Sequence, residues 1–147
     1  MKLSAETHDD LQHFFRRHFS DHELRLPPIT IHAGLLAKLL LKANGMGAIT
    51  FGRHVLVRPT LVKKDAEGRA TMPGWLLAHE ATHVLQYEQR GYLRFFRDYL
   101  RGYCRGLRAG KSWDAQGRMA AYMSIEEEHS AREAEHAYRE LRRPKLN

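Results

Sequence analysis

Residues 79–83 read His-Glu-Ala-Thr-His, a His-Glu-x-x-His motif. On an α-helix, residues four apart lie on the same face, so His79 and His83 can direct two imidazoles at one Zn²⁺. Glu80 lies about 100° further around the helix, where it can reach a zinc-bound water without being a ligand. With 10 histidines in the chain, a chance match is the alternative, and the histidines of an ordinary buried helix would only pack or form hydrogen bonds.

The flanking sequence favours a core helix that presents a site. Apolar residues fall on the arc opposite the two histidines, and these are Leu77, Ala78, Ala81, Val84 and Leu85. Thr71 and Pro73 are suited to the start of this helix, with a capping hydroxyl and an early proline. Gly91 is suited to its end.

A catalytic zinc usually has three protein ligands and an open position for water. The extended His-x-x-Gly-x-x-His continuation is excluded, because the chain has Gln86 and Gln89 where a glycine and a histidine are required. A later acidic helix is the alternative source, with candidates Glu126, Glu127, Glu128, Glu133 and Glu135. Helical periodicity favours Glu127, which projects toward the arc of small residues, whereas Glu128 projects toward the polar side. The alternative is that these glutamates form a solvent-exposed charged segment and bind no metal.

The remaining patterns predict an α+β fold, a mostly helical single domain over residues 1–147 with a small β-hairpin near the motif helix. The expected helices span residues 6–19, 35–42, 71–91, 92–107 and 119–142, and the expected strands span 29–32, 48–51 and 54–57. Gly52-Arg53 is typical of a tight hairpin turn. Residues 63–70 are expected to form a polar loop, as is the segment marked by Gly106, Gly110 and Gly117.

Composition and charge give expectations for the binding partners and the cellular location of the protein. The net charge is +7, which favours acidic partners. Arginines recur every three or four residues along the 92–107 helix, at Arg94, Arg97, Arg101, Arg105 and Arg108. This basic stripe is either a solvated helix face or a surface that contacts nucleic acid or anionic lipid. A single cysteine, Cys104, and the lack of a signal peptide or transmembrane segment favour a cytoplasmic location.

From Leu26 to about Gln89 the chain resembles a bacterial domain family of formally unknown function that is grouped with the gluzincin-type zinc metallopeptidases. The shared order is a strand, a short helix, a hairpin and then the motif helix followed by Val84-x-Gln86. Tyr122-x-Ser124-Ile125-x-x-Glu128 also resembles the segment that carries the ligand glutamate in relatives, so the resemblance implies Glu128 where periodicity favours Glu127.

The resemblance implies a glutamate zincin that hydrolyses peptide bonds. One departure concerns the aspartate expected four residues after the ligand glutamate, because Ala131 or Arg132 stands there. The leading hypothesis is therefore a zinc metallopeptidase with Glu80 as general base, and Tyr122, Tyr138, His129 and His136 are candidate oxyanion donors by chemistry alone. The alternative is a non-enzymatic, zinc-stabilised basic module that binds nucleic acid or an anionic membrane through the stripe.

Overall fold

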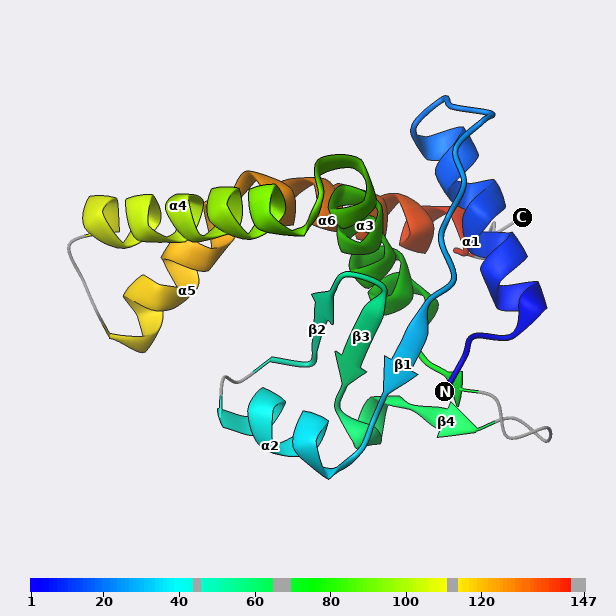
Figure 1. The fold of residues 1–147 in the computed structure, drawn as a ribbon, viewed down its shortest axis with the longest axis horizontal. Helices are drawn as coiled ribbons and strands as arrows, with labels where there is room; N and C mark the ends of the chain where they lie inside the picture. The colour runs from blue at the N-terminus through cyan, green and yellow to red at the C-terminus, as the bar shows by residue number, and fades with distance from the viewer. Residues whose placement is uncertain (44–45, 65–69, 111–113, 144–147) are drawn as a thin grey trace.

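The computed structural model describes residues 1–43, 46–64, 70–110 and 114–143 (Figure 1). The helices are α1 (Ala5–His18), α2 (Leu35–Ala43), α3 (Gly74–Arg90), α4 (Tyr92–Gly110), α5 (Ala115–Met123) and α6 (Glu126–Leu141), with a short 3₁₀ helix at Pro59–Leu61. The strands are β1 (Thr30–His32), β2 (Ala48–Phe51), β3 (His54–Val57), β4 (Lys63–Lys64) and β5 (Ala70–Thr71). The predicted α+β class, mostly helical with a small sheet, is confirmed. None of the helices in the described ranges is long and apolar enough to cross a membrane.

A three-stranded sheet in the order β1-β3-β2 positions the site. The predicted hairpin of β2 and β3 is confirmed residue for residue, with Ala48 opposite Val57 and Phe51 opposite His54. Its turn requires Gly52, which has φ of 60° and would direct any Cβ into the ring of Tyr92. Because β2 pairs only with β3 in the described sheet, β2 forms an edge of the sheet, on the side of α3.

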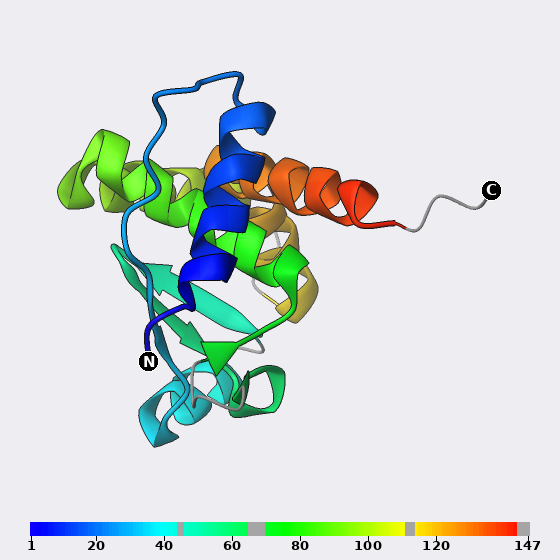
Figure 2. The same ribbon diagram turned by 90° about the vertical axis from the view of Figure 1, so that its right-hand side faces the viewer.

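The long helix α3 lies between the sheet and α6, and α1 crosses α6 on the far side (Figures 1 and 2). Apolar side chains from all of these elements form one core. Among its fully buried members are Phe15, Ile31, Val55, Leu77 and Val84. Burial of α3 on both sides stabilises the helix far more than its own propensity could.

Three local predictions were wrong. Thr71 does not cap α3, because its hydroxyl donates to the Lys63 carbonyl in a small ladder between β4 and β5, where a loop was expected. Gly106 and Gly110 lie inside α4, which is longer than expected. The single helix expected over 119–142 is divided into α5 and α6, because Ser124 Oγ bonds back to the Ala121 carbonyl and Ile125 is extended.

The apolar face of α4 does not pack inward as a whole. Only Phe95 and Leu107 are buried in this helix, while Leu93 is 90% exposed. Phe96, Leu100 and Cys104 are also exposed. The helix lies along the outside of the molecule (Figure 1), and much of its hydrophobic surface is in contact with solvent.

Candidate metal centre

The motif residues of α3 are enclosed by protein. Every side chain from Leu76 to Tyr87 is buried, including His79, Glu80 and His83. The imidazoles of His79 and His83 lie on the same side of the helix, with ring centroids 5.1 Å apart. The i,i+4 geometry predicted from the sequence is therefore present, at a place that excludes most water.

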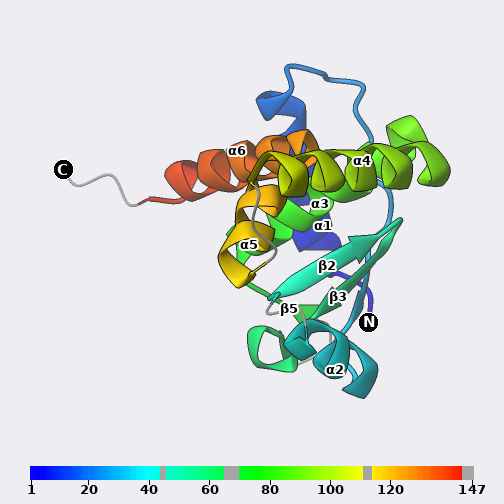
Figure 3. The same ribbon diagram turned by 90° about the vertical axis from the view of Figure 1, so that its left-hand side faces the viewer.

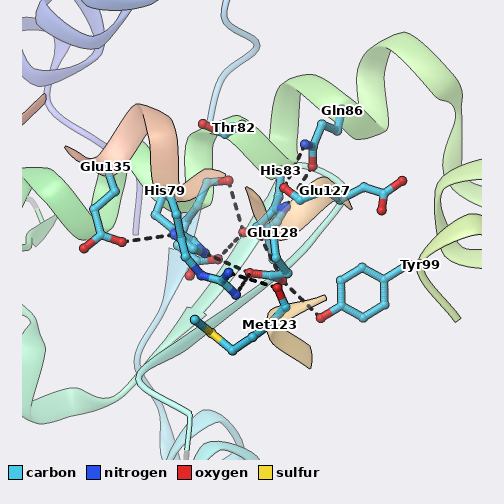
Figure 4. A network of polar contacts seen from close by, with 12 residues as sticks. His79, Thr82, His83, Gln86, Tyr99, Met123, Glu127, Glu128 and Glu135 are labelled. Atoms are coloured by element: carbon cyan, nitrogen blue, oxygen red, sulfur yellow. Dashed lines mark hydrogen bonds and ion pairs between the residues drawn. The ribbon is translucent and has the colours of Figure 1, made fainter. Parts of the chain in front are cut away.

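The first turn of α6 brings Glu128 to the two histidines (Figure 4). Its Oε2 lies 3.4 Å from His79 Nε2, and its Oε1 lies 3.4 Å from His83 Nε2. One potential ligand atom from each of the three residues lies within 4.8 Å of the others, and all three side chains are buried. This group could hold a metal ion.

Glu127 is directed elsewhere. Its carboxylate accepts a 2.6 Å hydrogen bond from Arg90, and its backbone carbonyl accepts one from Gln86. Periodicity placed Glu127 on the buried side of the helix, where it does lie, but burial alone does not say which neighbour a side chain meets. Of the two glutamates that the sequence left open, Glu128 meets the histidines and Glu127 meets Arg90.

Each histidine has a partner for its other ring nitrogen. His79 Nδ1 lies 3.2 Å from Glu135 Oε2, and His83 Nδ1 lies 2.8 Å from Gln86 Oε1. Such contacts fix the tautomer that leaves Nε2 free for a metal. Glu135 thus supplies a carboxylate for His79 although the expected position holds Arg132. The sequence could have indicated Glu135 as this partner, because it follows Glu128 by two helical turns and lies on nearly the same face.

Glu80 is buried beside this group without contributing to it. Thr50, on the edge strand β2, donates a 2.7 Å hydrogen bond to Glu80 Oε2. Burial raises the pKa of Glu80 above its usual value, even though His83, His79 and the Thr50 hydroxyl act in the opposite direction. A carboxylate with a raised pKa is a stronger base, as proton abstraction near neutral pH requires.

Two tyrosines contact Glu128 from the other side. Tyr99, on α4, donates a 3.1 Å hydrogen bond to Glu128 Oε1, and Tyr122, on α5, also bonds to Glu128. Burial raises the pKa of both phenols, and the nearby Glu128 carboxylate raises it further, so both hydroxyls keep their protons. Tyr99 had no signal in the sequence, because nothing in the pattern of α4 distinguishes it.

The donor set fits a zinc ion. Burial raises the pKa of Glu128, but the adjacent His79 and His83 imidazoles outweigh burial and hold it well below its usual range, so the carboxylate is charged. Its Oε2 atom is buried and has no hydrogen-bond partner. Arg132 lies 4.0 Å from this oxygen and His79 Nε2 lies 3.4 Å from it, so both are near without forming a hydrogen bond, and a metal ion would supply the missing partner. Two imidazole nitrogens and a carboxylate are a common ligand set of catalytic zinc.

The group opens into a cleft of about 1040 Å³. Its floor includes His79, Glu80, His83 and Glu128, and its walls are mostly apolar side chains from α2, β2 and α4. Tyr122 lines this cleft, which keeps it available as an oxyanion donor. Tyr138 instead bonds to Asp10 of α1. His129 and His136, the other two candidates, are exposed side chains of α6 outside the residues that line the cleft.

Comparison with known proteins places part of the chain in a described family. A model of a bacterial family described as the eCIS core domain matches residues 2–91, from the N-terminal segment to the end of α3. The match includes His79, Glu80 and His83 but ends before Glu128. No curated protein and no solved structure matches the chain.

Proposed function

The chain belongs to the eCIS core domain family, and we propose that it is a zinc-dependent peptide hydrolase with Glu80 as its general base. His79, His83 and Glu128 would hold the metal. The observation that carries this proposal is the buried Glu128 carboxylate, whose two oxygens each lie 3.4 Å from one Nε2 atom and one of which forms no hydrogen bond. The ligand set, with the base one residue after the first histidine, is that of the gluzincin-type peptidases that the sequence resembles.

A zinc ion bound there would act as a Lewis acid, lowering the pKa of a water molecule and polarising the scissile carbonyl. Glu80 accepts the proton of the attacking water and then donates it to the leaving amine. The hydrogen bond from Thr50 holds the Glu80 carboxylate in one orientation. Glu135 and Gln86 hold the two imidazoles.

Tyr122 and Tyr99 are the phenols placed to stabilise the oxyanion. Both line the cleft beside Glu128, and both stay protonated, as a hydrogen-bond donor must. Removing one oxyanion donor commonly lowers kcat by about 10²–10³-fold. We expect Tyr122→Phe to lose activity on this scale while it retains zinc, and the same test applied to Tyr99→Phe identifies which phenol acts.

The walls of the cleft favour an extended, apolar polypeptide as substrate. β2 has an unpaired edge in the described sheet, next to the Thr50–Glu80 contact, and an added strand could pair with it. Apolar side chains such as Met46 and Phe95 line the cleft on either side. The family description, in which eCIS denotes an extracellular contractile injection system, further suggests that the protein works within a multiprotein assembly.

The test combines metal content with hydrolysis of a peptide library. Wild type, His83→Ala, Glu80→Gln and the matched control Glu88→Gln are purified without added metal and without a histidine tag. Glu88 lies on the same helix but on the surface, where it pairs with Arg53. We expect about one zinc per chain and activity in wild type and Glu88→Gln, as a three-ligand site predicts. We expect zinc without activity in Glu80→Gln, and neither in His83→Ala.

Two outcomes would contradict the proposal. Full hydrolysis by Glu80→Gln would remove Glu80 from the chemistry. Zinc in wild type without cleavage of any peptide, together with unfolding of the protein on chelation, would instead favour the zinc-stabilised interaction module.

A further inference from the structure

Helix α4 has three distinct sides. One side packs inward through Phe95 and through Gly102 and Gly106, which lie against Ile125 and Ala121. The next side exposes the large apolar residues Leu93, Phe96 and Leu100. Beyond it along the helix surface runs the basic stripe Arg94, Arg97, Arg101, Arg105 and Arg108, all of which are exposed.

Helix α2 is arranged in a similar way. Ala37 and Leu41 face the core, whereas the outward side carries the exposed leucines Leu35, Leu36 and Leu39. Leu35 is 72% exposed. Lys38 and Lys42 are exposed beside these leucines. A globular protein normally turns such a stripe inward, so a short helix that presents its leucines to solvent indicates a binding surface.

The two apolar sides belong to one region of the molecule. Leu35 and Leu36 of α2 and Phe96 of α4 line the same cleft. Figure 3 shows α2 and α4 on either side of β2, on the side of the molecule that faces the viewer. Apolar residues with cationic neighbours therefore flank the mouth of the cleft on both sides.

We propose that this face docks on the surface of an anionic lipid bilayer. The exposed leucines of α2 and the apolar side of α4 enter the boundary between headgroups and acyl chains, and the guanidinium groups of the stripe contact lipid phosphates. Helices that lie in the interface have this composition, with leucine and aromatic residues on one side and lysine or arginine beside them. Long arginine side chains can reach the phosphates while the helix axis lies deeper.

Binding to nucleic acid would explain fewer features of this surface than binding to a bilayer. A phosphate backbone requires cations, but gives no role to leucines on two separate helices. Arg94 and Arg97 also lie near Asp98, which offsets part of their charge, so Arg101, Arg105 and Arg108 dominate the field of the stripe. Charge and apolar exposure occur together on this face, and a bilayer satisfies both.

The test is co-sedimentation of the full chain with vesicles of phosphatidylcholine that contain about one-third phosphatidylglycerol, a negative surface of the kind that attracts basic segments. Arg101→Glu with Arg108→Glu reverses two charges of the stripe. Arg17→Glu with Arg25→Glu is the matched control, because it changes the net charge equally at exposed positions of α1 and the segment that follows it. Leu35→Ser with Leu93→Ser removes one apolar contact from each helix.

We expect the stripe variant to bind at least about 25-fold more weakly, since each cation near an anionic surface contributes about fivefold to affinity. The control should stay close to wild type. The leucine variant should lose about tenfold per residue, and this loss should persist in high salt. Zinc content and circular dichroism verify that each variant is folded, so the result is independent of any hydrolytic activity.

Three results would overturn the proposal. One is wild-type protein that does not sediment with these vesicles. Another is an equal loss in the stripe and control variants, which would mean attraction by net charge alone. The third is a wild type that self-associates in light scattering, becomes monomeric in the leucine variant and ignores vesicles, which would assign the face to a second copy of the chain.

Discussion

The contact between Glu135 and His79 predicts the metal affinity of the site. It joins Glu135 Oε2 to His79 Nδ1 at 3.2 Å, and Glu135 also accepts a 2.8 Å hydrogen bond from Arg139. Loss of such a partner commonly lowers metal affinity by about 10–100-fold. Because Glu135 is partly exposed and shares its charge with Arg139, we expect the lower end for Glu135→Ala, about tenfold or ~1.4 kcal/mol.

A second variant, Glu135→Gln, separates the effect of the charge from that of the hydrogen bond. Glu135→Gln retains an oxygen that can accept from Nδ1 but loses the negative charge, so its affinity should fall between wild type and Glu135→Ala. Glu133→Ala is the matched control, because Glu133 is exposed on the same helix and has no part in the site.

Zinc affinity is measured by competition with a chromophoric chelator at constant pH, with thermal unfolding of the metal-free proteins as a folding control. Equal affinities for Glu135→Ala and Glu133→Ala would refute the role of Glu135 in orienting His79. A loss in both, with a matching loss of stability, would show that the effect arises from α6 as a whole.

Four further variants test the stability of the protein. Gly106→Ala should destabilise the protein by about 1–3 kcal/mol, because its Cβ would lie 2.7 Å from the Ala121 Cα. Gly102→Ala meets nothing closer than 3.7 Å and should stabilise α4 by about 0.5–1 kcal/mol, and chemical denaturation distinguishes the two. Arg90→Ala leaves the buried Glu127 carboxylate without its donor and should destabilise the protein by about 1–3 kcal/mol, as measured by chemical denaturation. Burial raises the pKa of Tyr87 from 10.0 to about 12. The protonated phenol therefore stabilises the folded protein fully below pH 10, and this stabilisation is lost as the pH rises toward 12. Tyr87→Phe should reduce this loss of stability at alkaline pH in thermal melts.

The sequence predicted best where local chemistry and tertiary structure agree. The hairpin was found to the residue, because its strands alternate and Gly52 is required in the turn. The helix of His79 and His83 was found because its apolar side and its ligand side are both visible in the pattern. Its function as a metal centre stays a prediction.

The sequence-based predictions were wrong where a contact with another helix determines the environment of a side chain. Periodicity favoured Glu127 and placed Glu128 toward the polar side, which was wrong, because both side chains are buried. Arg90 contacts Glu127 and the two histidines contact Glu128, and these partners come from other helices that the pattern of one helix does not reveal. The pattern of α4 was read correctly as amphipathic. Its apolar side is nevertheless only partly buried, and Leu93 faces solvent.

Gly91 separates two groups of site residues along the chain. The family match ends there, at a backbone turn with φ of 76° that separates α3 from α4. The proposed general base and two candidate ligands precede this turn, while Glu128, Glu135 and one wall of the cleft follow it. Substitutions after Gly91 are therefore expected to change the affinity of the proposed metal site without altering the proposed general base.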